Sequence, residues 1–84
     1  MSIWIVHFDT EPDVMYFRNA KRAYDYMKNT LTDYISSCNE WGDREQVLHY
    51  ENELEELERE YSAINEDDSI FGANIMYARK EEVY

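Results

Sequence analysis

The chain contains few of the residues on which several classes of site depend: one cysteine, one proline, two glycines and eight basic residues among 84. A lone Cys38 permits neither an intramolecular disulfide nor a cysteine-rich metal site. Two glycines are too few for a phosphate-binding glycine loop. No apolar run approaches the roughly 20 residues that span a bilayer, and the first residues lack the basic start of a signal peptide. We therefore expect a cytoplasmic chain that binds no cofactor.

The two histidines give little indication of a metal site or a catalytic site. His49 shares a helical face with Glu45 and Glu53 at i,i+4 spacing, which could hold a metal ion. A histidine between two glutamates is more often part of a surface ion pair, and no nucleophile–base pair is recognisable in the sequence. We expect no metal site, no catalytic residue and no enzymatic activity.

The length and composition predict one folded domain that covers residues 1–84. Hydrophobic residues make up 44% of the chain and aromatic residues 15%, which is too many for a disordered polypeptide. Ile3 to Phe8 is rich in β-branched and aromatic residues and predicts a strand. Val14–Phe17 follows a turn-forming segment and predicts a second strand, although a helix capped by Thr10 is an alternative.

Two apolar seams at heptad spacing predict two amphipathic helices. The first begins after Asn19, a good N-cap, and ends before the loop around Trp41-Gly42-Asp43, where the glycine stops the helix. The seam positions are Ala20, Tyr24, Met27, Leu31, Tyr34 and Cys38 in the first helix, and Val47, Tyr50, Leu54, Leu57, Tyr61 and Ile64 in the second. Because the loop between them is short, the helices should form an antiparallel αα-hairpin.

Ile70 to Arg79 predicts a final strand. The expected order is β-β-α-α-β, an α+β domain with the helical hairpin packed on a small two- or three-stranded sheet.

The acidic residues are concentrated in one part of the chain. The formal net charge is −11, and residues 43–68 hold eleven acids and two bases. This charge disfavours direct binding to nucleic acid or to anionic membranes and favours a basic protein surface as partner. The predicted contact residues are those that lie outside the apolar seam or in the loop after it: Glu51, Glu53, Glu55, Glu56, Glu58, Glu60, Glu66, Asp67 and Asp68.

Two simpler interpretations of this acidity stay open. Many small proteins are acidic because charge keeps them in solution. In addition, Arg18, Lys21 and Arg22 begin the first helix, so an antiparallel hairpin would bring them near Glu58 and Glu60. However, glutamates at i,i+3 and i,i+4 repel one another by a few tenths of a kcal/mol per pair, and a sequence selected only for solubility would intersperse lysines.

Four tyrosines occupy the seams, whereas Tyr16, Tyr26, Tyr77 and Tyr84 have no predicted place in the core. Tyrosine is frequent at protein–protein contacts because it offers a large area at low entropic cost. Tyr26, beside Lys28, is the predicted exposed contact on the first helix.

In overall character the chain resembles small acidic host-inhibition proteins encoded by phages, namely anti-CRISPR proteins and DNA-mimic inhibitors. The resemblance rests on size, acidity, aromatic content and the lack of catalytic residues, and on no motif. It implies inhibition of a nucleic-acid-binding protein, such as a nuclease, a CRISPR effector or a polymerase, by occupation of its basic surface. The alternative is a structural adaptor or homodimeric assembly module whose acidic face only aids solubility, so the chain could be a monomer or a homodimer.

Overall fold

The chain begins with a β-hairpin, as the β-branched and aromatic content of its first residues and the following turn predict. In the computed structural model, which describes residues 1–65 and 67–82, β1 (Ser2–Phe8) pairs antiparallel with β2 (Val14–Phe17), and Ile5 lies opposite Tyr16. The segment Val14–Phe17 is therefore a strand and not the start of a helix.

Both helix boundaries of α1 (Ala20–Trp41) follow from local chemistry. The Asn19 side chain accepts a hydrogen bond from the Arg22 N–H at 2.9 Å, which satisfies one of the free donors of the first turn. Gly42 ends the helix with a φ of 74°, a left-handed conformation that glycine adopts at low cost. Asp43 then caps α2 (Arg44–Ser62) through the Gln46 N–H. The predicted hairpin is confirmed.

The two seams meet through paired aromatic rings. Tyr24 stacks on Tyr61 with ring centroids 4.1 Å apart, and Tyr34 contacts Tyr50 at 5.2 Å. These pairs set the antiparallel register of the helices, and between them lie the fully buried core residues Met27, Leu31 and Leu57.

The C-terminal segment differs from the prediction of a single strand. It forms a second hairpin, β3 (Ile70–Gly72) and β4 (Met76–Glu82), with Ala73 to Ile75 in the turn. The turn requires glycine at position 72, because a Cβ there would lie 2.5 Å from the carbonyl oxygen of Met76. The resulting sheet has four antiparallel strands in the order β2-β1-β4-β3.

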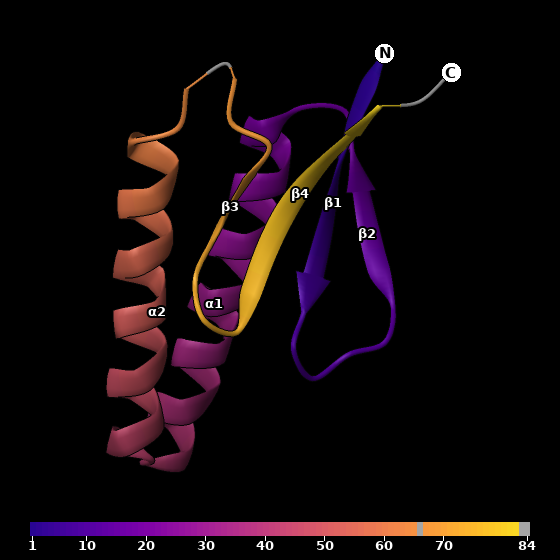
Figure 1. Ribbon diagram of the computed structural model, residues 1–84. Coiled ribbons are helices and arrows are strands. Elements are labelled where there is room, and N and C mark those ends of the chain that lie inside the picture. The colour runs from indigo at the N-terminus through magenta and orange to yellow at the C-terminus, as the bar shows by residue number, and fades with distance from the viewer. Residues whose placement is uncertain (66, 83–84) are drawn as a thin grey trace.

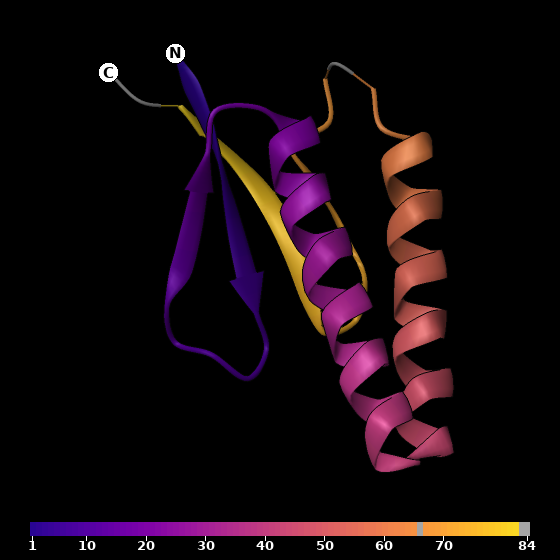
Figure 2. The same cartoon turned by 180° about the vertical axis from the view of Figure 1, so that it is seen from behind.

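The helices cover one face of this sheet, and the fold is α+β as predicted. Trp4, Val6 and Ala78 point toward the helices and form the core with Met27 and other residues of α1 and α2. Both views show the lower ends of α1 and α2 extending past the sheet, while β1 and β4 bring Ser2 and Glu82 together at the opposite end (Figures 1 and 2). Within the described part of the chain, neither helix is long and apolar enough to cross a membrane.

Candidate functional site

The glutamates of α2 lie in three different environments, which the sequence did not distinguish. Glu53 differs most from the expected exposed position, because it is only 3% exposed. Its Oε2 accepts a hydrogen bond of 2.9 Å from the backbone N–H of Asn74 in the turn between β3 and β4. The prediction that Glu53 lies on the exposed surface is therefore wrong. This carboxylate holds the second β-hairpin against the helix.

Glu56 and Glu60 lie on the same side of α2 as Glu53. Glu56 is half-buried and pairs with Arg59 at 3.2 Å. Glu60 is exposed but lines a hollow with Ile70 and Tyr77 beside β3. This side of the helix therefore faces the protein's own second hairpin, and the predicted row of carboxylates on this side is interrupted.

The opposite side carries the acidic flank, which we define as Glu51, Glu55 and Glu58. All three are exposed, and their spacings of four and three residues place them in a row. Among these three, and within the described residues, only Glu58 forms an ion pair, with Lys28 of α1 at 3.6 Å. Neither Glu51 nor Glu55 forms an ion pair there, and Lys21 pairs with Asp25 of its own helix.

The predicted contact residues of the following loop are less uniform. Asp67 is exposed. Asp68 is half-buried, and its Oδ2 accepts a hydrogen bond of 2.8 Å from the Asn65 N–H, which stabilises the turn. Glu66 lies outside the described residues, as does Tyr84. Of the two described acids in this loop, Asp67 is therefore the exposed one.

Tyr26 is not the exposed contact that the sequence predicts. It is half-buried, and its ring packs against Phe17 and Phe8 with centroids 5.2 and 6.0 Å away. Since Tyr26 lies on the side of α1 that covers β2, it belongs to the margin of the core.

The most exposed large aromatic residue in the described part of the chain is Trp41, at 86%. It is the last residue of α1 and lies where the helical hairpin extends past the sheet. Its neighbours Glu40, Asp43 and Glu45 are all exposed acids. The sequence marked Trp41 only as part of a loop, because heptad periodicity carries no information on residues beyond the seam.

The second feature missed is the sheet surface that the helices leave uncovered. We call this the open face. The strand registers place six apolar or aromatic side chains on it, and they are Ile3, Ile5, Val14, Tyr16, Ile70 and Tyr77. A strand exposed on one face normally alternates apolar and polar residues, and β1 does not.

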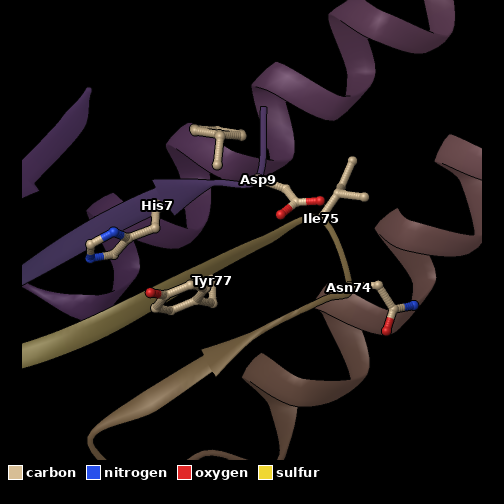
Figure 3. A pocket seen from close by; sticks show the side chains of 6 residues that line it. His7, Asp9, Asn74, Ile75 and Tyr77 are labelled. Carbon is tan, nitrogen blue, oxygen red and sulfur yellow. The ribbon is translucent and has the colours of Figure 1, made fainter. Parts of the chain in front are cut away.

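A hollow of about 250 Å³ lies at one end of this sheet, lined by residues that include His7, Asp9, Asn74 and Tyr77. His7 of β1 lies beside Tyr77 of β4, and the two rings stack with centroids 4.7 Å apart (Figure 3). His7 Nε2 is buried, and no described residue forms a hydrogen bond with it.

A second hollow, of about 230 Å³, lies between the sheet and the hairpin and is lined by residues that include Phe8, Tyr34, His49 and Tyr50. Burial raises the pKa of the Tyr34 hydroxyl above 10.0, and the nearby Glu11 carboxylate raises it further. Tyr34 is therefore a neutral phenol at physiological pH and not a base. Among residues 1–65 and 67–82, no three histidine, cysteine or acidic side chains converge as metal ligands, and Glu53 is held by Asn74 and not by His49.

No known protein family, curated protein or solved structure matches this chain. The function must therefore be inferred from the two surfaces, the acidic flank and the open face.

Proposed function

We propose that this protein is a non-catalytic inhibitor that binds the basic, nucleic-acid-binding surface of another protein through its acidic flank. The observation that supports this most directly is that Glu51 and Glu55 are exposed in a row with Glu58 and have no ion-pair partner among the described residues. Neighbouring carboxylates on a helix repel one another, so the row costs stability in the free protein. A row of cations on a partner would relieve that repulsion.

The dimensions of the flank suit such a surface. Neighbours at i,i+3 and i,i+4 lie about 5–6 Å apart, and the row from Glu51 to Glu58 rises about 10 Å along the helix at 1.5 Å per residue. Phosphates of a nucleic-acid strand follow one another at a comparable spacing. Lysines and arginines arranged to hold phosphates can therefore bind these carboxylates.

Trp41 offers an aromatic contact that can add affinity to a complex formed through the acidic flank. Rim charges mainly raise the association rate and the specificity of a complex, whereas buried aromatic anchors dominate its affinity. Trp41 lies on the same hairpin as the acidic flank and is surrounded by further acids. A partner with an apolar pocket bordered by basic residues fits both features.

We expect that reversing Glu51 and Glu55 to lysine weakens binding to the partner by about 30-fold or more, equivalent to roughly 2 kcal/mol. The partner is first captured with wild-type protein from the native cell and then purified. Its affinity for each variant is measured by isothermal titration calorimetry. Binding should also weaken as salt rises, and duplex nucleic acid should compete for the same site.

The matched control is Glu11→Lys with Asp13→Lys in the exposed loop before β2, which changes the net charge by the same amount. This control should retain wild-type affinity to within about threefold, because two exposed charges away from a contact contribute little. Equal loss in both double variants, or in neither, would show that the acidic flank is not the contact.

Replacing Trp41 with alanine is expected to weaken the same complex by 2 kcal/mol or more, the range of a hot-spot residue. The loss should be in the dissociation rate and should depend little on salt, since Trp41 carries no charge. Surface plasmon resonance at two salt concentrations separates these effects. An unchanged dissociation rate would remove Trp41 from the contact and leave the acidic flank alone.

A further inference from the structure

We infer that the open face of the sheet is an interface with a second copy of this chain, so that the protein forms a homodimer with its helices on the outside. The inference goes beyond the proposed function and does not rest on it, because the open face and the acidic flank belong to different surfaces. It rests on the residue pattern of β1, the exposed apolar side chains of the open face and the charge of that face.

The pattern of β1 is that of a strand covered on both faces. Trp4 and Val6 point toward the helices, while Ile3 and Ile5 point to the open face. Continuous apolar strands are typical of sheets with both faces covered, whereas strands exposed on one face alternate with polar residues. Ile5 is already buried in the single chain at 5% exposure, whereas Tyr16 at 63%, Ile70 at 57% and Tyr77 at 39% are substantially exposed.

The charge of the open face favours a second copy as the occupant. The charged residues on its strands are Arg79 and Glu81, which pair at 3.6 Å, and Glu60 of α2 borders it beside Ile70 and Tyr77. The chain as a whole carries −11, and its most acidic segment lies on α2, on the other side of the sheet. Two copies can therefore meet at the open face with their acidic helices far apart. In a two-fold arrangement, Arg79 of one copy can also meet Glu81 of the other.

His7 belongs to the open face through its ring. Its buried Nε2 lacks a hydrogen-bond partner among the described residues, and buried polar atoms are nearly always paired in folded proteins. His7 lies on the open face beside Tyr77 (Figure 3). Nε2 is closed off within the single chain, so His7 contributes its stacked ring, and not this atom, to the open face.

The area of the open face indicates how weak the proposed dimer should be. Strands about 4.8 Å apart that rise about 3.4 Å per residue give a flat area of roughly 350 Å² for this sheet. Two such surfaces fall in the class of weak interfaces, which bury less than about 1,200 Å² in total. The dimer should therefore be weak, and the experiment must extend to high protein concentration.

Sedimentation equilibrium between about 5 and 500 µM tests the inference. The wild-type mass should rise from 10.2 kDa toward twice that value. The dimer should become tighter from 0.1 to 1 M NaCl, because the Debye length falls from about 10 to about 3 Å and screens the repulsion between two acidic chains. This salt dependence is opposite in sign to that expected for binding of the acidic flank to a basic partner.

The variant Tyr16→Lys with Ile70→Lys should raise the dissociation constant at least tenfold, since it places cations on an apolar contact. The control Thr32→Lys with Ser36→Lys makes the same change of charge at exposed positions of α1 and should dimerise like the wild type. Far-UV circular dichroism confirms that each variant is folded. A wild-type monomer at 500 µM in both salts, or equal behaviour of the two double variants, would overturn the inference. The inference and the proposed function fail separately, because Glu51→Lys with Glu55→Lys should leave the dimer intact.

Discussion

Replacing Leu57 with alanine is expected to lower the free energy of unfolding by about 2–5 kcal/mol, the range for a leucine removed from a tight core. Leu57 is fully buried and belongs to the cluster that includes Trp4, Met27 and Phe71. The surrounding side chains come from both helices and from the sheet, so they cannot all move to fill the cavity. Because a domain of this size has little stability to lose, the variant should be largely unfolded at moderate urea concentrations.

Leu48→Ala is the matched control for this measurement, since Leu48 lies on the same helix but is an exposed side chain. Its effect should stay within about 0.5 kcal/mol. Urea denaturation followed by circular dichroism gives both values. If the midpoints of the two variants coincide, the packing of the seam on the sheet is not what stabilises the fold.

Reversing Glu53 to lysine is expected to cost about 3–5 kcal/mol, although glutamate-to-lysine changes on exposed helix positions cost little. The substitution removes the acceptor of the Asn74 N–H and places a cation in a site that is almost closed to water. A buried charge without a partner carries a penalty of this size. The second β-hairpin should detach from α2 or the chain should unfold.

Two other variants show how much of the stability loss in Glu53→Lys comes from the buried position and how much from the change of charge. Glu53→Gln keeps an acceptor for the Asn74 N–H and should cost about 1 kcal/mol. Glu55→Lys, on the exposed side of the same helix, should be nearly neutral. Thermal denaturation of the three variants checks the order. A Glu53→Lys protein as stable as Glu55→Lys would contradict the clamp between α2 and the β3–β4 turn.

The helices could be predicted from the sequence, because their capping residues and apolar repeat are local features of the chain. Asn19 and Gly42 mark the two ends of α1 through their own hydrogen bonds and dihedral angles, so no tertiary contact is needed to recognise them. The seams follow from a repeat that is visible along the chain. In contrast, the split of the last strand depends on Gly72, whose importance is steric and arises only when β4 folds back on β3.

The candidate site could be predicted only in part for the same reason. Helical periodicity places Glu53 off the apolar seam, but the β3–β4 turn, 21 residues later in the sequence, covers it and supplies its donor. Likewise, β1 is apolar on both sides, so its sequence does not say which face the helices cover. The apolar character of the open face became evident only once the strand registers were known.

The two central strands of the sheet, β1 and β4, come from opposite ends of the described chain, with Phe8 opposite Met76 and Ser2 opposite Glu82. Contacts between residues so distant in sequence form slowly, because a long loop must close before any pairing energy is gained. The helical hairpin is local and can form early. During synthesis, β1 and the apolar side of the hairpin therefore lack their partner strand until β4 emerges, and that interval is when the chain is most exposed to aggregation.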